Sequence, residues 1–318
     1  MKKVLVTREI PRAAIELLEK HFEVKLNPED RPMTKEELYR DAKQCDAVLT
    51  QLTDKIDGEF FDECPNIKIC ANYAVGYDNF DVIAAKDRNV VLTNTPDVLS
   101  ETTAELAWAL LMSVSRRIVE ADNYLRDGNW KQFKPTLLLG QDLYGKTLGI
   151  LGAGRIGKAF VKKSLGYDMD VIYHNRSRDE LFEKKYGARW VSKQELYEKS
   201  DVLSIHVPLT KETYHMVDKQ AFKEMKPNTI LINTSRGSVV DQEALINALE
   251  NKLIWGAGLD VFEEEPMVPK KLLAMEQVVL TPHIGSASRE TRTDMGILAA
   301  RNIIEVLEGR EPLTQVTK

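Results

Sequence analysis

Short apolar runs alternate with amphipathic helical stretches over the first hundred residues. The segments 12–20 and 34–42 carry apolar residues at helical spacing, and the second opens with a capping box of Thr34 and Glu37. The runs around them have the length and the β-branched content of strands. They are KVLVT (3–7), FEVKL (22–26), DAVLT (46–50), IKICAN (67–72) and NVVLTN (89–94). This alternation predicts βαβ units around a parallel sheet.

A second alternation of the same kind begins at residue 146. Its apolar runs are again typical of strands, and helical stretches separate most of them. One of these stretches, SKQELYEKS, opens with a second capping box formed by Ser192 and Glu195. The six runs are KTLGIL, MDVIYH, DVLSI, NTILIN, WGAGLD and QVVLTP. The pattern predicts a second parallel sheet covered by helices.

Two helices and an irregular arm complete the pattern. One long helix is expected at about 100–126, followed by an arm with aromatic residues at 128–145. The last amphipathic segment, about 287–308, is predicted to form one terminal helix. A length of 318 residues allows roughly two domains of ~150 residues each. The expected fold is therefore α/β, with two doubly wound parallel-sheet domains.

Composition and charge narrow the classes of function. A formal net charge of -5 without a basic run argues against nucleic acid or an anionic membrane as a partner. The apolar stretches are much shorter than the ~18 residues of a membrane span, and the first is too short for a signal peptide. Cys45, Cys64 and Cys70 are odd in number without CxxC spacing, and the five histidines lack metal-ligand spacing. We expect a cytoplasmic protein with reduced thiols and no metal site.

The stretch LGAGRIGKAF indicates a cofactor. It places Gly152, Gly154 and Gly157 in a G-x-G-x-x-G pattern between a predicted strand and a predicted helix. In that context the first glycine allows a tight turn, the second allows a pyrophosphate to approach, and the third allows close helix–strand packing. The helix N-terminus adds amides and a positive dipole end. A strand–turn–helix without a ligand is the alternative, and the context favours a dinucleotide.

The end of the next strand indicates which dinucleotide is expected. An acid about 20 residues after the first glycine normally binds the ribose hydroxyls. This sequence has HNRSR (174–178) at that strand end, and the nearby acids stand at the start of the strand. Arg176 can pair with a 2′-phosphate and Ser177 can donate a hydrogen bond to it, with Asn175 beside them. NADP(H) is the expected cofactor, with NAD(H) use left open; a solvated basic turn is the alternative.

Three further stretches end predicted strands and carry the residues of a reaction. NTSRG has Arg236, LDVFEEEP has Asp260 and Glu265, and TPHIGS has His283. Ligands of parallel α/β sheets bind at this edge. An arginine that holds an anionic substrate, a histidine that donates a proton and a carboxylate that orients it predict hydride chemistry on a carbonyl. A surface ion pair and a structural histidine are the alternatives.

These motifs, with ANYAVGYDNFD (71–81), resemble those of the D-isomer-specific 2-hydroxyacid dehydrogenases over nearly the whole chain. Within that family the sequence looks most like the glyoxylate/hydroxypyruvate reductases. The resemblance implies a flavodoxin-like substrate domain formed by residues 1–100 and 286–318. It implies a Rossmann cofactor domain at 101–285, which includes a dimerisation arm. It further implies a homodimeric, NAD(P)-dependent oxidoreductase that reduces glyoxylate or hydroxypyruvate to the D-2-hydroxy acid.

The resemblance also implies the roles of individual residues. Arg236 matches the residue that binds the substrate carbonyl and carboxylate, His283 the acid/base, and Glu265, five positions after Asp260, its partner. Phe133 stands where some relatives have a tryptophan that enters the neighbouring active site. The expected substrate-binding positions are Leu52, Val75, Gly76, Arg236 and His283. The expected cofactor-binding positions are Thr103, Gly152, Gly154, Arg155, Ile156, Gly157, Asn175, Arg176, Ser177, His206, Val207, Pro208, Thr234, Ser235, Asp260 and Gly285.

Other functions remain open at this point. A 2-ketogluconate reductase would fit the same motifs. A phosphoglycerate dehydrogenase would need more basic residues for the phosphate, and no motif favours formate or phosphite dehydrogenases. A non-catalytic dinucleotide-sensing protein of the same fold would keep much of the same arginine, glutamate and histidine set. Turnover of 2-oxo acids is therefore the observation that separates an enzyme from a sensor.

Overall fold

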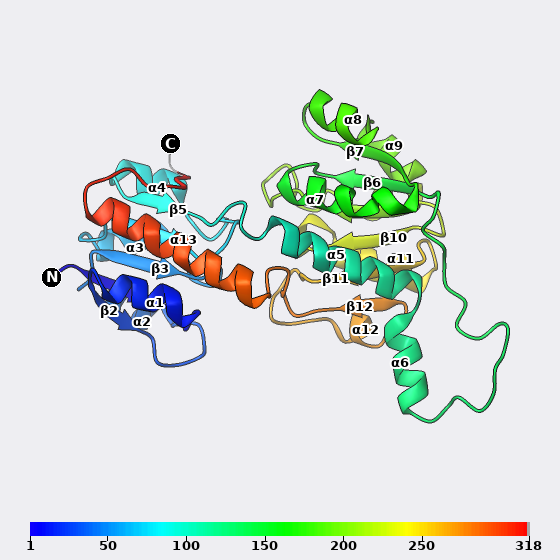
Figure 1. Ribbon diagram of the computed structural model, residues 1–318, viewed down its shortest axis with the longest axis horizontal. Helices are drawn as coiled ribbons and strands as arrows, with labels where there is room; N and C mark the ends of the chain where they lie inside the picture. Colours follow the sequence, from blue (N-terminus) through cyan, green and yellow to red (C-terminus); the bar gives the residue numbers. More distant parts are fainter. Residues whose placement is uncertain (317–318) are drawn as a thin grey trace. The chain divides into compact units, whose positions relative to one another are not determined.

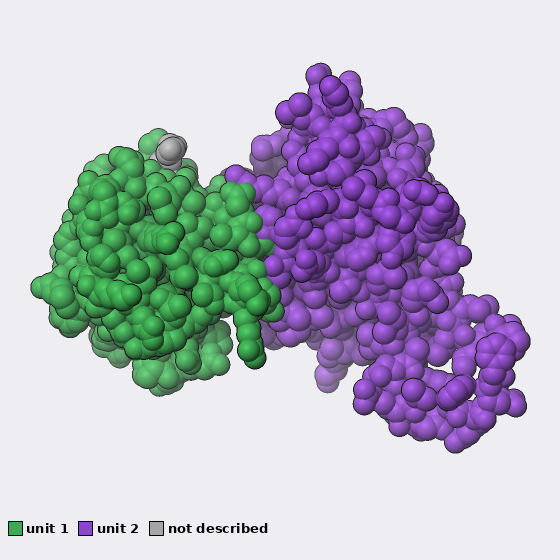
Figure 2. Space-filling model, viewed as in Figure 1, with its two compact units in different colours: residues 1–99, 286–318 green, residues 100–285 purple. Residues whose placement is uncertain are grey.

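The protein, a computed structural model of which residues 1–316 are described, divides into two compact units. One unit consists of residues 1–99 and the segment that starts at residue 286, and the other of residues 100–285 (Figures 1 and 2). Each unit has its own parallel sheet. The predicted α/β class with two parallel-sheet units is confirmed. In the described part of the chain, no helix is both long and apolar enough to cross a membrane.

The first unit is a five-stranded parallel sheet with helices on its faces. Its strands are β1 (Lys3–Val6), β2 (Glu23–Leu26), β3 (Ala47–Thr50), β4 (Ile69–Asn72) and β5 (Val91–Thr93). Its helices are α1 (Arg12–Glu19), α2 (Lys35–Ala42), α3 (Gly58–Glu63), α4 (Val82–Asp87) and α13 (Arg289–Leu307). The strand order β2-β1-β3-β4-β5 is that of flavodoxin-like folds.

The helices of this unit cover the sheet in two groups. Helices α1 and α13 pack on each other, and α13 also contacts β3, β4 and β5. Helices α2, α3 and α4 contribute Leu38, Phe60 and Ala85 to a core that also contains Val48 of β3. The chain that follows residue 286 therefore completes the fold that the first hundred residues begin.

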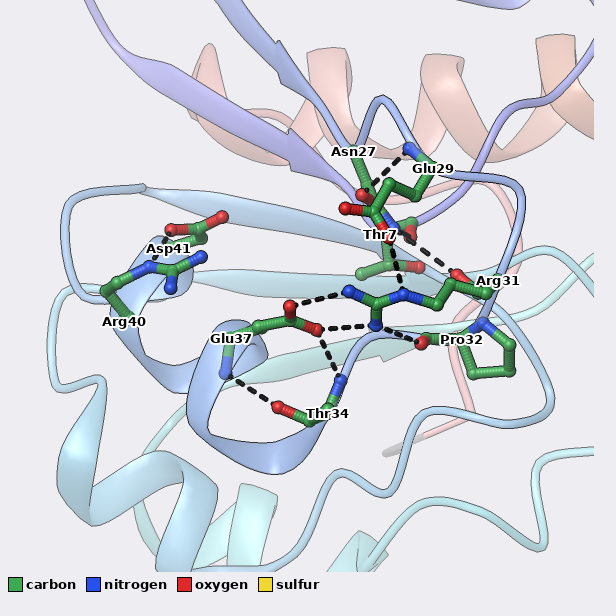
Figure 3. A network of polar contacts seen from close by, with 9 residues as sticks. All are labelled: Thr7, Asn27, Glu29, Arg31, Pro32, Thr34, Glu37, Arg40 and Asp41. Carbon is green, nitrogen blue, oxygen red and sulfur yellow. Dashed lines mark hydrogen bonds and ion pairs between the residues drawn. The ribbon is translucent and has the colours of Figure 1, made fainter.

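The start of α2 carries the predicted capping box. Thr34 Oγ1 accepts a hydrogen bond from the Glu37 amide at 3.3 Å, and Glu37 accepts one from the Thr34 amide at 2.8 Å (Figure 3). Arg31 binds the same carboxylate with both terminal nitrogens, at 2.7 and 2.8 Å. This hydrogen bond holds the pKa of Glu37 at about 2, below its usual range. The Asn27 side-chain amide ties the neighbouring loop to the Thr7 carbonyl at 3.0 Å.

The second unit is a seven-stranded parallel sheet. Its strands are β6 (Thr147–Leu151), β7 (Asp170–His174), β8 (Arg189–Trp190), β9 (Val202–Ile205), β10 (Ile230–Asn233), β11 (Gly256–Leu259) and β12 (Val278–Leu280). Its α-helices are α5 (Ser100–Ser115), α6 (Ile118–Arg126), α7 (Arg155–Ser164), α8 (Glu180–Tyr186), α9 (Lys193–Lys199), α10 (Lys219–Glu224), α11 (Gln242–Glu250) and α12 (Lys270–Leu273). Two short 3₁₀ helices, η1 (Leu165–Tyr167) and η2 (Gly237–Val239), complete it.

The strand order of this sheet creates the switch point at which a ligand is expected. The order is β12-β11-β10-β9-β6-β7-β8, so that the chain reverses its direction of winding between β6 and β9. This is the Rossmann order, with one additional edge strand. Separate apolar cores lie on its two faces: one includes Leu110, Phe160 and Tyr173, and the other Phe222 and Leu249.

The single helix predicted at 100–126 is wrong, because two helices, α5 and α6, form there. Arg117 between them has φ 52, a left-handed conformation that ends an α-helix. The Ser115 carbonyl accepts a hydrogen bond from the Gln141 amide at 2.7 Å, so the returning chain holds the break. Helix α5 buries Leu110, Leu111 and other residues, whereas α6 has no buried residue. Because the apolar residues keep helical spacing across residues 116–117, the sequence pattern does not indicate the break.

Two smaller expectations about the second unit are also wrong. The sheet has seven strands instead of six, because the two-residue strand β8 was not predicted. Both of its residues are exposed, so no apolar pattern marks it. At the start of α9, Ser192 accepts a hydrogen bond from the Glu195 amide at 3.1 Å, but the Glu195 carboxylate binds Lys199 and Arg189. The second capping box is therefore only half formed.

Candidate active site

The glycine-rich turn connects β6 to α7 at the switch point of the sheet. Gly152 has φ +97, which L side chains rarely adopt, and a Cβ there would lie 2.8 Å from the His206 carbonyl carbon and the Val207 nitrogen. A Cβ on Gly157 would lie 2.4 Å from the Gly152 oxygen. The turn is therefore packed directly against the backbone that follows β9, and larger residues at these two positions would push it away.

The start of α7 has room for a phosphate group. Gly154 is its N-cap without a side-chain hydrogen bond, and a Cβ added there would meet no atom within 4 Å. Arg155 and Ile156 form the first turn, whose backbone amides and dipole favour an anion. The Thr234 hydroxyl, which follows β10, is buried and has no hydrogen-bond partner within residues 1–316. Open space, helix amides and a buried free hydroxyl fit a bound dinucleotide.

Asn175, directly after β7, shapes the glycine-rich turn. Its side-chain oxygen accepts a hydrogen bond from the Ala153 amide at 2.8 Å. Its carbonyl accepts one from the indole nitrogen of Trp190 in β8, at 3.1 Å. The side chain of Asn175 is thus used within the protein, and the unpredicted strand β8 helps to hold the turn.

The three residues after Asn175 divide into two kinds. Arg178 forms an ion pair with Glu183 of α8 at 2.6 Å. Arg176 and Ser177 have exposed side chains. None of residues 174–178 is acidic, and Arg176 and Ser177, which were predicted to bind a 2′-phosphate, face solvent there. The carboxylate of Glu212 lies near Arg176: a hydrogen bond from Thr210 and the charge of Arg176 both lower its pKa.

His206 follows β9 and is held as a neutral ring. Its Nε2 lies 2.8 Å from Ser204 Oγ, and the ring packs against Phe160 with centroids 5.4 Å apart. This burial lowers the pKa of His206 to about 3. The ring is thus used within the protein, while the backbone of His206 and Val207 lies against Gly152. Val207 is half-buried and Pro208 is exposed.

His283 and Glu265 form a direct pair after β12 and β11. His283 Nδ1 lies 2.7 Å from one carboxylate oxygen of Glu265, and the other oxygen accepts a hydrogen bond from the Phe262 amide at 3.0 Å. Burial raises the pKa of Glu265, but the hydrogen bond and charge of His283, the Phe262 amide and the charge of Arg236 together outweigh it, so the pKa lies below its usual value. Glu265 is therefore ionised at neutral pH and accepts the Nδ1 proton. The following Glu265–Pro266 peptide bond is cis.

The backbone of His283 has an unusual conformation. Its φ is 53, a left-handed value that is rare for residues other than glycine. Its amide donates hydrogen bonds to the carbonyls of Asp260 and Thr281, at 2.9 and 3.1 Å. Such conformations persist where the surroundings enforce them, and they concentrate at functional sites.

Asp260 anchors the loop that carries His283. One oxygen of its carboxylate accepts hydrogen bonds from Thr281 Oγ1 at 2.6 Å and from the Ile284 amide at 2.8 Å. The other accepts one from the Gly285 amide at 2.7 Å. Burial raises the pKa of Asp260, although these hydrogen bonds oppose the shift. The carboxylate therefore fixes both flanks of His283.

Gly285 also brings a residue of α5 to this loop. A Cβ at Gly285 would lie 3.2 Å from Asp260 Oδ2 and 3.3 Å from the Thr103 methyl group. Thr103 is buried near the start of α5. The expected cofactor positions Thr103, Asp260 and Gly285 are thus neighbours in space, although they are far apart in the chain.

Arg236 stands in a turn that Asn233, the last residue of β10, organises. Asn233 donates a hydrogen bond to the Arg236 carbonyl at 2.9 Å and accepts two from Ser235 at 3.0 Å. Arg236 Nη1 binds the Ser235 carbonyl at 2.8 Å. A Cβ on Gly237 would lie 1.9 Å from the carbonyl carbon of Phe262, so this turn touches the backbone that leads to Glu265.

A second histidine–glutamate pair explains why Glu263 does not serve His283. His215 Nε2 makes a short contact with the Glu263 carboxylate, and the His215 amide donates to the Ser238 carbonyl at 2.8 Å. Composition alone could not distinguish Glu263 from Glu265 in the run of three glutamates. In the structure the first binds His215 and the third binds His283.

The remaining predicted positions lie in the first unit. Leu52 follows β3, and Val75 and Gly76 follow β4. All three residues are half-buried. Sequence analysis did not identify the side chains that hold these loops, Asn72 and Asn94, nor Asn233 and Thr281 of the second unit. The one signal that could have found them is their position at or just after the last residue of a strand.

A sheet of this order, with a glycine-rich turn at its centre, is the dinucleotide-binding fold of NAD(P)-dependent oxidoreductases. Residues 108–285 match the family described as D-isomer specific 2-hydroxyacid dehydrogenase, NAD binding domain. A glyoxylate reductase of Korarchaeum cryptofilum is 50% identical over 312 residues, which cover 98% of this chain and 94% of that protein. The chain belongs to the D-isomer specific 2-hydroxyacid dehydrogenase family and is an NAD(P)-dependent oxidoreductase.

Solved structures agree in fold along the whole chain. A protein from Thermus thermophilus is 43% identical with a TM-score of 0.93, and the match covers 99% of both chains. The NADPH-dependent glyoxylate/hydroxypyruvate reductase of Sinorhizobium meliloti, solved with NADP and malonate, is 35% identical with a TM-score of 0.88. That match covers 99% of this chain and 96% of the other.

Proposed function

We propose that this enzyme reduces glyoxylate or hydroxypyruvate to the D-2-hydroxy acid with NAD(P)H. The observation that carries the proposal is the contact between His283 Nδ1 and the ionised Glu265, with Arg236 near enough to lower the pKa of the same carboxylate. Relatives that match nearly the whole chain are glyoxylate reductases. A histidine, a carboxylate and an arginine are the groups that reduction of a 2-oxo acid needs.

The proposed mechanism consists of one proton transfer and one hydride transfer to the carbonyl group. Because Glu265 accepts the Nδ1 proton of His283, the imidazolium carries its transferable proton on Nε2. His283 donates that proton to the carbonyl oxygen, and the Arg236 guanidinium stabilises the negative charge that develops on this oxygen. A dinucleotide held by the turn 152–157 would supply the hydride to the carbonyl carbon. Glu265 remains ionised throughout and holds the ring in place while the proton leaves.

Turnover with a panel of 2-oxo acids tests this proposal. We expect loss of NADPH absorbance with glyoxylate and hydroxypyruvate, with a higher kcat/KM than with pyruvate or a 2-ketogluconate. A higher kcat/KM for the 2-ketogluconate would overturn the substrate assignment. No turnover of any member of the panel would favour a dinucleotide-sensing role.

The two units receive different roles in this proposal. The first, expected as residues 1–100 and 286–318, is the substrate domain, in which Leu52 lines the pocket and the amides of Val75 and Gly76 bind the substrate carboxylate. The second, expected as 101–285, binds the dinucleotide through the turn 152–157 and the segments after its other strands. The compact units divide at almost the same residues, which supports this assignment.

NADP(H) is the proposed cofactor because Arg176 and Ser177 are exposed just after β7 and none of residues 174–178 is acidic. We expect Arg176→Ala to raise KM for NADPH by about tenfold or more and to leave KM for NADH nearly unchanged, since only NADPH carries the 2′-phosphate. The measurement is steady-state kinetics with both cofactors at saturating glyoxylate.

Arg178→Ala is the matched control for this cofactor prediction. It removes the same charge two residues away, but Arg178 is paired with Glu183. Its effect on KM for NADPH should therefore be small. Equal rises in KM for both cofactors in Arg176→Ala, or equal effects of the two arginine variants, would make the cluster a solvated turn and overturn the preference for NADPH.

A homodimer formed through the arm at 128–145 and the preceding helix α6 is also proposed. Helix α6 has no buried residue, and Leu125, Trp130 and Phe133 are 57%, 57% and 81% exposed. Apolar side chains gathered in one projecting segment favour a second copy as their cover. A sedimentation-equilibrium mass of 36.1 kDa, that of a single chain, would contradict the dimer.

The buried, free cysteines are consistent with the proposed cytoplasmic location, which cell fractionation can test.

A further inference from the structure

The turn that follows β4 has three consecutive carbonyl groups tied to buried donors. The Ala74 carbonyl accepts a hydrogen bond from the Thr95 amide at 2.8 Å. The Val75 carbonyl accepts one from the Asn94 side chain, and the Gly76 carbonyl one from the Asn72 side chain, both at 2.8 Å. All three donor residues are buried, and the chain bends at 73–75.

These contacts also set the direction of the amide groups. Because a trans peptide unit is planar, its N–H points opposite to its C=O. Carbonyls held toward the interior therefore direct the N–H groups of Val75, Gly76 and Tyr77 away from the buried donors. None of these three amides has an acceptor in the part of the chain that the structure describes. Three adjacent amides directed outward form a binding site for an anion such as a carboxylate.

Both polar atoms of the Asn72 side chain form hydrogen bonds within the protein. Its oxygen accepts a hydrogen bond from Thr50 Oγ1 at 3.1 Å, and its amide also donates to the Asn79 oxygen at 3.0 Å. Asn79 donates in turn to the carbonyls of Gln51 and Asp54, at 3.1 and 2.9 Å. The same network thus fixes the turn after β4 and the segment that carries Leu52.

Asn94 is held by the segment that follows α13. Its carbonyl accepts a hydrogen bond from Thr314 Oγ1 at 2.6 Å, and its amide lies 3.3 Å from the Thr314 carbonyl. Asn302 of α13, which is fully buried, donates to Thr314 Oγ1 at 2.8 Å and accepts from the Thr314 amide at 3.0 Å. A continuous hydrogen-bonded chain therefore runs from α13 through Thr314 and Asn94 to Val75.

We propose that Asn72 and Asn94 are positioning residues, which aim the amides of the 75–77 turn at the carboxylate of the substrate. Neither side chain touches the substrate; each holds one peptide unit in the orientation that binds it. The inference rests on the proposed function, because a 2-oxo acid supplies the carboxylate. It also gives a role to the segment after α13, in which Thr314 forms hydrogen bonds to the backbone of Asn94.

The test uses Asn72→Leu and Asn94→Leu, which keep the side-chain size and remove the donor. Each should raise KM for glyoxylate by about tenfold, the effect expected for one lost hydrogen bond, while KM for NADPH stays nearly unchanged. The dissociation constant of oxamate, a carboxylate that cannot be reduced by hydride transfer, should rise by a similar factor. Thr314→Val leaves both asparagines in place and should give a smaller rise in KM for glyoxylate and in the dissociation constant of oxamate. This variant tests the inference even if a leucine variant does not fold.

Asn27→Leu is the matched control. Asn27 also binds backbone carbonyls of its own unit, those of Thr7 and Arg31, but at a different loop (Figure 3). It should lower the melting temperature as the other variants do, and leave both KM and the oxamate constant nearly unchanged. If KM for glyoxylate and the oxamate dissociation constant rose equally in Asn27→Leu and in the Asn72 and Asn94 variants, these asparagines would only stabilise the fold. That result would overturn the inference.

The oxamate titration separates this inference from the proposed function. It needs no turnover and can follow the amide resonances of Gly76 and Tyr77 directly. If wild-type protein reduces no 2-oxo acid but binds oxamate at these amides, and the variants bind it about tenfold more weakly, the inference stands and the proposed function fails. If oxamate does not shift these amides, or if the variants bind it as the wild type does, the inference fails whatever the enzyme reduces.

Discussion

Replacing His283 by alanine is expected to lower kcat for glyoxylate by about 10²–10⁴-fold, the usual contribution of a general acid. The physical reason is the pairing with Glu265: because Nδ1 is held at 2.7 Å from an ionised carboxylate, Nε2 is the ring atom left to transfer a proton. KM for NADPH should change little, because the turn at 152–157 does not depend on the ring. Steady-state kinetics with both substrates varied gives the two quantities.

The surface pair of His21 and Glu308 supplies the control for this prediction. Its nitrogen and oxygen lie 2.9 Å apart, close to the 2.7 Å of the proposed catalytic pair, but it belongs to the first unit and both residues are more than twenty positions from every expected site residue. His21→Ala should keep near-normal kcat. A His283→Ala enzyme that also keeps near-normal kcat would remove the histidine from the mechanism.

A variant of Glu265 distinguishes orientation from proton transfer. Glu265→Gln keeps an acceptor for the Nδ1 proton but loses the negative charge beside the ring. The lost charge should lower kcat less than the loss of the ring does, since the donor itself remains. A loss as large as that of His283→Ala would mean that the two residues act as one unit, as coupled catalytic groups commonly do.

The elements predicted well from sequence are those that apolar spacing defines. Strands such as β6 and β10 are buried along nearly all of their length, so their pattern repeats what the sheet requires. The break at Arg117 and the exposed strand β8 carry no such pattern. A helix that continues in apolar spacing but ends at a left-handed residue can be recognised only from the chain that packs on it, here the Gln141 amide on the Ser115 carbonyl.

The same distinction separates the predicted from the unpredicted residues of the site. Gly152, Arg236 and His283 stand at strand ends within recognisable motifs. Asn72 and Asn94 donate hydrogen bonds to carbonyls 4 and 19 residues away in the chain. The sequence alone does not indicate which carbonyl the side chain of an asparagine contacts. Side chains that position a backbone are therefore visible only in the folded chain, although the residues that they position are visible in the sequence.

Replacing Arg236 by lysine is expected to lower kcat/KM for glyoxylate by about 10²-fold or more, although the charge is kept. A guanidinium is planar and presents several donors in a fixed fork, whereas an ammonium is a point charge. In this structure Nη1 is already used on the Ser235 carbonyl at 2.8 Å, which fixes the plane of the group. A lysine cannot bind that carbonyl and also bridge a carbonyl and a carboxylate of the substrate. KM for NADPH should change little.

Arg178→Lys provides the comparison, because Arg178 also forms a two-nitrogen contact, with Glu183, at an exposed position. An exposed ion pair contributes little, so this variant should keep the activity of the wild type. If Arg236→Lys also kept its kcat and KM, positive charge alone would suffice at that position and the fork would be unnecessary. If the lysine variant lost kcat but retained its affinity for oxamate, Arg236 would act on the developing oxyanion, and the carboxylate would be bound mainly by the amides of the 75–77 turn.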